Sequence, residues 1–316
     1  MTYDWETHLL LILSDSALPT GGFIASSGLE AFFQHGFLCL DRSAGNIQNI
    51  QSPYDLLSFI RTSLASYALL ALPLFDKAYE VVHNVCRPSL DTVSKPEEIS
   101  LAVDELRKVD SNLEAMLLNH VTRRASKSQG AALLTLYCRA YAKLPAADAQ
   151  PMPQSEELRY QSHDEFSSEL IQRLKWTIRA KSTGMHGHLP VYFAVVCAAL
   201  GLPLGNQVLS TPLPRTICTL DRATYLHLFV QARAILSSSV RLNIVGPYAA
   251  QRMLLLDVPP LLQECLQECQ RHAPDTKDEN GHDTTQAQKS GPVTTWPSGE
   301  ILAGRHEQLH SRIFNS

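Results

Sequence analysis

The spacing of apolar residues is the feature that most restricts the fold of this chain. Along most of its 316 residues, apolar side chains recur every three or four positions, the period of an α-helix that buries one face. Leu56, Ile60 and Leu64 illustrate it, whereas strand-like alternation is confined to weak fragments near Val208 and Ile217. We therefore predict an all-α protein, folded as a single helical bundle of about ten helices with inserted disordered loops.

The limits of each helix are predicted from this period and from residues that start or stop helices. Pro73 suits a first helical turn, so we expect one helix to end before it and another to follow it. The predicted helices cover residues 4–13, 26–34, 53–71, 74–85, 97–109, 113–144, 166–180, 188–200, 221–239, 249–256 and 260–272.

Three polar segments interrupt the helical pattern. Residues 40–52 and 145–164 are predicted to be inserted loops. Residues 273–299 contain too little apolar surface to offset the entropy cost of ordering, so we predict a disordered linker. Apolar residues return in 300–316. We therefore divide the chain into a helical domain over 1–272, this linker, and a C-terminal tail that docks on a partner.

Composition and charge argue against several classes of protein, including nucleic-acid-binding, secreted and membrane-spanning proteins. Hydrophobic residues make up 45% of the chain and the formal net charge is −4, which does not favour a nucleic-acid-binding protein. Asp4 and Glu6 precede the first apolar stretch, unlike a signal peptide, and no apolar run approaches the roughly 20 residues that span a bilayer. Seven cysteines without a paired framework indicate reduced thiols, so we expect a cytoplasmic protein.

The first motif is a turn between two predicted helices. A proline and paired glycines interrupt the helical pattern, and a serine can cap the helix that follows. The glycines lack the lysine and the spacing of a phosphate-binding loop, and no strand precedes them. We interpret the motif as structural, with a ligand site as the alternative. Its residues are Pro19, Gly21, Gly22, Phe23, Gly28 and Glu30.

The second motif places positive charge on a helix. Arg123 and Lys127 are four residues apart and share a face, with Arg124 and Gln129 nearby. These residues form either an ordinary solvated face or a contact surface for an acidic partner. Gly130 costs about 1 kcal/mol relative to alanine inside a helix, which indicates a close helix crossing there.

Two groups of residues are weak candidates for metal binding. His186 and His188 flank a glycine, and either one is also suited to cap the following helix. Cys265, Cys269 and His272 lie within reach of one another on a helix, where two buried thiols are the simpler interpretation. A closed metal site needs about four ligands, so neither group predicts a firmly bound cofactor.

The C-terminal tail combines sparse apolar anchors with polar groups. Either it is a recognition segment that orders on a partner, or it is a terminal helix packed on its own domain. The polar and aromatic residues in question are Arg305, His306, Glu307, His310, Ser311, Arg312, Phe314 and Ser316. No nucleophile elbow, zinc-protease motif or dinucleotide fingerprint occurs, so we do not expect an enzyme.

Taken together, these motifs resemble the UreF family of urease accessory proteins. The family opens with Ala-Leu-Pro-x-Gly-Gly-Phe and then Ser-x-Gly-Leu-Glu, and it ends with Arg-His-Glu, a spacer and Ser-Arg-Leu-Phe-x-Ser. The corresponding stretches are 17–23, 26–30, 305–307 and 311–316. Between them, the basic helix ending in Gln-Gly, the Gly-His-x-Pro helix, a Val-Arg-Leu turn at 240–242 and Gln251-Arg252 also match. The extra loops suggest a eukaryotic, fungal-type member.

The resemblance implies a function that the residues alone do not. A UreF protein is all-helical and dimeric, binds the accessory protein UreD/UreH, and recruits the GTPase UreG to apo-urease for insertion of nickel. The tail residues would bind UreD/UreH, and Arg123, Arg124, Lys127 and Gln129 would face UreG or urease. Two alternatives remain: a protein that carries nickel on its own histidines and cysteines, and a cytosolic helical enzyme of unknown class.

Overall fold

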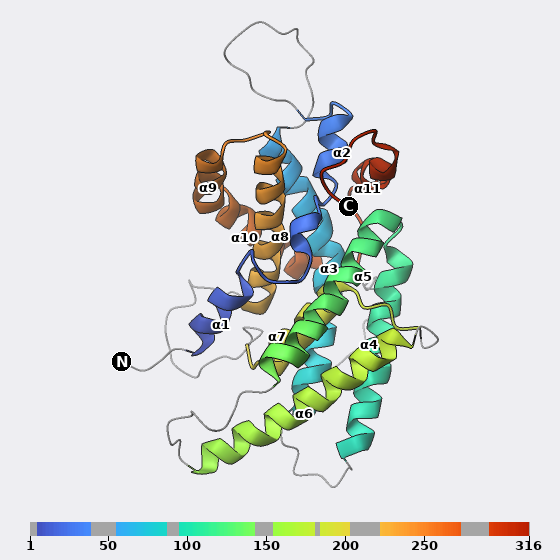
Figure 1. The fold of residues 1–316 in the computed structure, drawn as a ribbon, viewed down its shortest axis with the longest axis vertical. Helices are drawn as coiled ribbons and strands as arrows, with labels where there is room; N and C mark the ends of the chain where they lie inside the picture. The colour runs from blue at the N-terminus through green and yellow to red at the C-terminus, as the bar shows by residue number, and fades with distance from the viewer. Residues whose placement is uncertain are drawn as a thin grey trace, which may run out of the picture. The chain divides into compact units, whose positions relative to one another are not determined.

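The computed structural model describes residues 5–38, 55–86, 95–142, 154–180, 184–202, 222–272 and 291–315. Within these ranges every regular element is helical, which confirms the predicted all-α class (Figure 1). The predicted loop at 40–52 and the strand fragments near Val208 and Ile217 lie outside the described residues. The α-helices are α1 (Trp5–Leu13), α2 (Leu29–Gln34), α3 (Leu56–Cys86), α4 (Lys95–Met116), α5 (His120–Leu136), α6 (Gln154–Arg179), α7 (Leu189–Ala199), α8 (Arg222–Arg241), α9 (Pro247–Leu256), α10 (Val258–His272) and α11 (Pro297–Gly304).

The chain forms two compact units, each built from two separate stretches of sequence. Unit 1 contains Met1–Phe23 and Leu74–His227, and unit 2 contains Ile24–Pro73 and Leu228–Ser316. The predicted domain over 1–272 therefore contributes to both units. The C-terminal tail belongs to the same unit as the residues that directly follow the Pro/Gly turn.

The core of unit 1 is centred on α7. All of its side chains are buried, as expected for a helix that is apolar on every face. Helix α5 packs along α7 (Figure 1). A Cβ atom added at Gly130 would lie 2.2 Å from the carbonyl oxygen of Gly187, so only glycine fits at this contact. The predicted close contact at Gly130 is present, but it is with the loop residue Gly187 that leads into α7 and not with another helix.

Helix α3 does not break at Pro73, so the prediction of two helices at this point was wrong. Proline has no backbone N–H, and inside a helix it leaves the carbonyl four residues earlier without its usual donor. That carbonyl belongs to Leu69, and it accepts a hydrogen bond of 3.2 Å from the backbone N–H of Val293. A segment from the far end of the chain thus replaces the helical bond that Pro73 removes.

Helix α3 is also the one helix in the described ranges that is long and apolar enough to cross a membrane, by length and composition alone. A helix of this length was not predicted, because Pro73 was expected to divide the segment into two helices. Of its most apolar window, 56% is buried inside the protein. Such burial is typical of the core helix of a soluble protein.

Two further boundaries differ from the predictions. The break expected near residue 110 lies at Leu117–Asn119, because the Asn119 side chain accepts hydrogen bonds from the backbone N–H groups of Val121 and Thr122 and caps α5. The predicted loop at 145–164 is wrong from Gln154 onward, where α6 begins. That segment is polar but rich in Glu, Gln, Leu and Arg, which are good helix formers.

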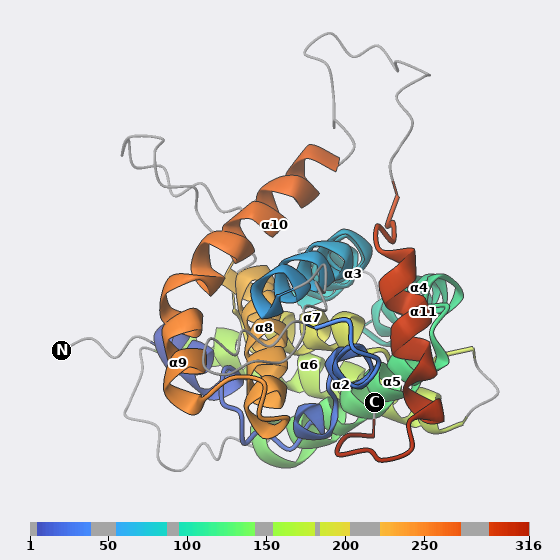
Figure 2. The same cartoon turned by 90° about the horizontal axis from the view of Figure 1, so that it is seen from above.

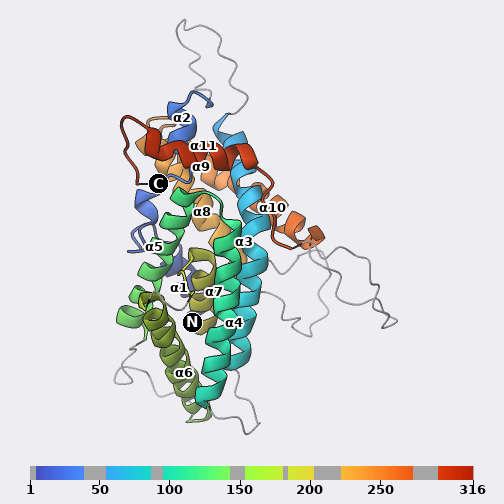
Figure 3. The same ribbon diagram turned by 90° about the vertical axis from the view of Figure 1, so that its right-hand side faces the viewer.

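In unit 2 the residues before the tail pack tightly. The ring of Trp296 lies 4.9 Å from that of Phe32 and 5.6 Å from that of Phe59, between ring centroids. The backbone N–H of Thr295 donates to the Ser66 hydroxyl, and α11 packs against α2 (Figure 2 and Figure 3). The predicted linker over 273–299 is therefore wrong for its described part, which begins at residue 291. Residues 273–290 lie outside the described residues.

Candidate functional site

The C-terminal tail is held by one buried carboxylate of α2. Glu30 is fully buried, and one of its oxygens lies 2.9 Å from Nε2 of His306, which is also fully buried. The backbone N–H groups of Ile313 and Phe314 donate to the same carboxylate at 2.6 and 3.1 Å. A buried carboxylate is costly unless its oxygens are satisfied, and here the tail satisfies both of them.

Neighbouring groups extend this contact along the tail. The Gln34 side chain donates to the carbonyl of Ser311, and the backbone N–H of Asn315 donates to the carbonyl of Ile24. The Arg241 guanidinium lies 4.3 Å from the centre of the Phe314 ring, a cation–π contact. We call Glu30, Gln34, Arg241 and the tail residues they hold, 305–315, the tail platform.

The predicted tail residues fall into two groups, those that are buried in the platform and those that are exposed. His306 and Phe314 are buried and fix the tail to unit 2, so they do not present a surface. The tail thus follows the second of the two open interpretations, packing on its own unit. Ser316 lies outside the described residues. The exposed members are Arg305, Glu307, His310, Ser311 and Arg312, joined by the exposed apolar side chain of Ile313.

The N-terminal motif supports the platform. A Cβ atom added at Gly28 would lie 2.8 Å from the Cβ of Ala303 in α11, and the φ angle of Gly28 is +82°. Gly21 also has a positive φ, Gly22 and Phe23 form a short 3₁₀ turn, and Phe23 is exposed. Pro19 lines two grooves that are open to solvent rather than an enclosed pocket. The structural interpretation of this motif fits these contacts better than a ligand site.

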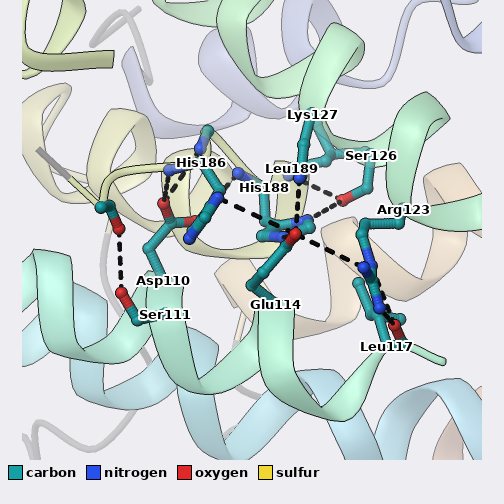
Figure 4. A network of polar contacts seen from close by, with 12 residues as sticks. Asp110, Ser111, Glu114, Leu117, Arg123, Ser126, Lys127, His186, His188 and Leu189 are labelled. Atoms are coloured by element: carbon teal, nitrogen blue, oxygen red, sulfur yellow. Dashed lines mark hydrogen bonds and ion pairs between the residues drawn. The ribbon is translucent and has the colours of Figure 1, made fainter. Parts of the chain in front are cut away.

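The basic residues predicted as a contact surface belong to a polar network in unit 1 (Figure 4). Lys127 Nζ lies 2.7 Å from an oxygen of Glu114, and an Arg123 guanidinium nitrogen lies 3.6 Å from the same oxygen. Arg123 also donates to the carbonyl of Leu117. Glu114 thus neutralises two of the three cations, while Arg124 is exposed and Gln129 is half-buried.

The same network fixes the segment that leads into α7. The backbone N–H groups of His186, Gly187 and His188 all donate to the carboxylate of Asp110, which is fully buried. Ser111 donates to the carbonyl of Gly184. Figure 4 shows this loop closed over α4 by these contacts. Asp110 therefore sets the entry of the buried helix α7.

The histidine and the acid at the centre of this network have shifted pKa values. Burial lowers the pKa of His188, although Asp110 and Glu114 attract its proton. Burial raises the pKa of Glu114, but hydrogen bonds from Lys127 and His188 outweigh it and leave the pKa below its usual value. A neutral His188 donates from Nε2 to Glu114 at 2.8 Å and accepts at Nδ1 from Ser126 at 3.2 Å.

These contacts disfavour metal binding at the two candidate groups. Both ring nitrogens of His188 are engaged, and burial raises the pKa of the Cys265 thiol to about 11, which disfavours the thiolate that metals bind. His272 Nδ1 lies 2.9 Å from the carbonyl oxygen of Glu268. Among the residues the structure describes, no group of three or more His, Cys, Asp or Glu side chains is placed to hold a metal ion.

Comparisons of the sequence with known proteins identify its family. The sequence model of the UreF family matches residues 50–210. The chain is 35% identical over 333 residues to "Urease accessory protein 6" of Cryptococcus neoformans, covering 98% of this chain and 97% of that protein.

The chain belongs to the UreF family. It is also 30% identical to "Urease accessory protein F" of Arabidopsis thaliana, over 99% of this chain and 92% of the relative. An "Uncharacterized urease accessory protein UreF-like" of Schizosaccharomyces pombe is 26% identical over 98% of this chain. The fungal-type resemblance is thereby confirmed.

Three motifs that carried the UreF resemblance meet in unit 2. These motifs are far apart in sequence but contribute to the tail platform. They are Ser26–Glu30, the Val-Arg-Leu turn around Arg241 and the Ser-Arg-Ile-Phe tail.

The sequence did not identify three members of the polar network in unit 1, Asp110, Glu114 and Ser126. Asp110 and Glu114 are four residues apart on α4, but ordinary surface acids have the same spacing, so no local signal identified them.

Proposed function

We propose that this UreF-family chain is a scaffold for urease maturation without catalytic chemistry of its own. It binds UreD/UreH, recruits the GTPase UreG, and brings both to apo-urease in the cytoplasm, where nickel enters the dinuclear site of urease. The chain acts as a homodimer. The relatives are named urease accessory proteins, and the match extends over nearly the whole chain.

One observation carries the assignment of UreD/UreH to the tail platform. The tail backbone is fixed by buried contacts, while Arg305, Glu307, His310, Arg312 and Ile313 are exposed. A segment already ordered before association loses less conformational entropy on binding than a free one. Arginine and an exposed aliphatic residue on an ordered segment are suited to a protein interface.

In this proposal nickel is cargo that passes through the assembly and is not a resident cofactor of this chain. The engaged nitrogens of His188 and the buried thiol of Cys265 support this view. Titration of the purified apo-protein with nickel tests the carrier alternative. Stoichiometric sub-micromolar binding that is lost on His186→Ala or Cys269→Ala would favour a carrier over a scaffold.

The scaffold function is tested by complementation. A urease-positive fungus that lacks its own UreF-family gene should regain urease activity and urease-bound nickel when it expresses this chain. The matched negative control is a strain that expresses the same chain with the exposed pair Arg305 and Arg312 changed to alanine. Failure of the unaltered, soluble chain to restore activity would refute the proposal.

The binding step is tested by pull-down of UreD/UreH. Removing all residues from Glu300 onward would also leave the buried Glu30 without its partners in the tail, so point substitutions are the sharper test. Arg305→Ala combined with Arg312→Ala should reduce capture at least as much as Glu30→Gln. Arg252→Ala combined with Arg271→Ala removes two exposed arginines elsewhere in unit 2 and should leave capture unchanged.

A further inference from the structure

A groove of about 480 Å³ runs between α5 and α6 in unit 1 and takes no part in either polar network. Leu134, Ile178 and Pro19 contribute to its apolar lining. Arg139, Lys175 and Arg179 also line it, and none of its described lining residues is acidic. Helices α5 and α6 are in contact here. The groove therefore combines an apolar floor with three positive charges.

These three cations differ from Arg123 and Lys127 on α5 and from Arg173 on α6, each of which lies close to an acid. Glu114 neutralises Arg123 and Lys127 on α5, and Glu169 lies 3.7 Å from Arg173 on α6. In the part of the chain that the structure describes, Arg139, Lys175 and Arg179 form no ion pair. Their charge is therefore available to an incoming group.

The backbone at one end of the groove departs from α-helical geometry. Residues Tyr137–Tyr141 form a π-helical turn, closed by a bond of 2.9 Å from the N–H of Ala142 to the carbonyl of Tyr137. One extra residue in a turn rotates the side chains that follow relative to the preceding helix, and such turns are frequent at functional sites. Arg139 lies within this turn and reaches the groove lining.

We propose that this groove binds an acidic segment of a partner protein that also carries an apolar anchor. The lining on α5 and the π turn extends from Ala131 to Arg139, about 12 Å along a helix axis, which matches roughly two helical turns of a partner. Three cations without acids select negative charge, and the apolar floor receives an aliphatic side chain. The groove is open to solvent, which suits a protein segment better than an enclosed small molecule.

This inference goes beyond the proposed function and does not depend on it, because it is tested by direct binding. The probe is a short fluorescein-labelled helical peptide of leucine and glutamate, followed by fluorescence anisotropy with the full chain. A peptide with glutamine in place of glutamate tests the need for charge. The groove variant combines Arg139→Glu, Lys175→Glu and Arg179→Glu. The control variant combines Lys77→Glu, Lys108→Glu and Arg252→Glu, which are exposed cations outside the groove with the same total change in charge.

We expect the groove variant to bind the acidic peptide at least about ten-fold more weakly than the unaltered chain, and the control variant to bind it nearly as well. The glutamine peptide should bind weakly to all three proteins. Ala132→Trp, which fills the groove without changing charge, should also weaken binding. Thermal unfolding of each variant identifies loss of folding. Equal losses in the groove and control variants, or tight binding by a folded groove variant, would overturn the proposal.

Discussion

Asp110 in unit 1 and Glu30 in unit 2 perform the same task with the same chemistry. Each is a fully buried carboxylate on a helix, and each accepts backbone N–H groups from a segment far away in sequence. Asp110 holds the loop that starts α7, the most completely buried helix, whereas Glu30 holds a chain terminus. The buried carboxylate of Asp110 therefore fixes the start of a core helix in unit 1, whereas that of Glu30 fixes a peripheral segment in unit 2.

We expect Asp110→Ala to lower the free energy of unfolding more than the other substitutions, because it would leave three backbone N–H groups near the core without their acceptor. Each buried, unsatisfied donor costs about 1–3 kcal/mol, so we expect a loss of roughly 3–5 kcal/mol in the free energy of unfolding. Urea unfolding measures it. The control Asp104→Ala removes an exposed acid one and a half turns away on α4 and should change stability little. Similar losses for both variants would contradict the role of Asp110.

The next effect is expected for Glu30→Gln. The amide keeps one acceptor oxygen, so one of the two tail N–H groups loses its partner, and the buried His306 loses its charged acceptor. A cost of about 2 kcal/mol to tail docking corresponds to roughly thirty-fold faster hydrogen exchange in residues 305–315, with a smaller change in global unfolding. Glu105→Gln, an exposed acid of unit 1, serves as the control. Unchanged exchange in the tail would show that Glu30 does not hold it.

The pH dependence of stability sharpens the comparison, because the two histidines with a lowered pKa among the described residues, His188 and His227, lie in unit 1. Burial lowers the pKa of His227 to about 3, and its ring packs against Phe75 and Phe193. Below about pH 6.5 His227 becomes protonated in the unfolded chain but stays neutral in the folded chain. Protons therefore favour the unfolded chain, and the free energy of unfolding falls as the pH decreases. Between pH 6.5 and pH 5 this group alone removes about 2 kcal/mol.

His227→Phe should remove that part of the acid sensitivity while preserving the aromatic packing. Urea unfolding at a series of pH values measures the slope, and tail exchange at the same pH values reports on unit 2. A variant whose stability still falls as steeply as that of the unaltered chain would assign the acid sensitivity to other groups.

The smallest effect is expected for Lys127→Ala. Its ion pair with Glu114 is partly exposed, with side-chain exposures of 32% and 20%. Such pairs contribute at most about 1 kcal/mol, and Arg123 remains beside the same acid. Thermal unfolding at low and high salt measures the loss, which should shrink as salt screens the pair. A loss comparable to that of Asp110→Ala would mean that the network, rather than Asp110 alone, supports α7.

Local signals were sufficient for much of the fold. The periods of the helices and the glycine at the close contact of α5 are properties of short stretches, and the structure confirms them. The errors occurred where local rules conflict with distant contacts. Helix α3 passes through Pro73 because Val293 supplies a donor from the other end of the chain, and no window of sequence around Pro73 contains that information.

For the candidate site too, the sequence identified individual residues, and only the structure showed how they contact one another. Sequence motifs identified Glu30, His306 and Phe314 as important and the tail as a patterned segment, but they could not show that the three are one contact. The basic residues of α5 were correctly placed on one helix, whereas their neutralisation by Glu114 depends on how α4 lies beside them.

The sequence by itself determined that this chain is helical, which segments are apolar on one face, and that it resembles the UreF family. Only the tertiary structure decided which polar groups are available for partners, since a charge is free or neutralised according to what lies within a few ångströms of it. Arg123 and Lys127 are paired, Arg139 and Arg179 form no ion pair with any residue that the structure describes, and His306 is buried while Arg305 beside it is exposed. These differences arise from burial and pairing between residues distant in sequence, which helical periodicity does not encode.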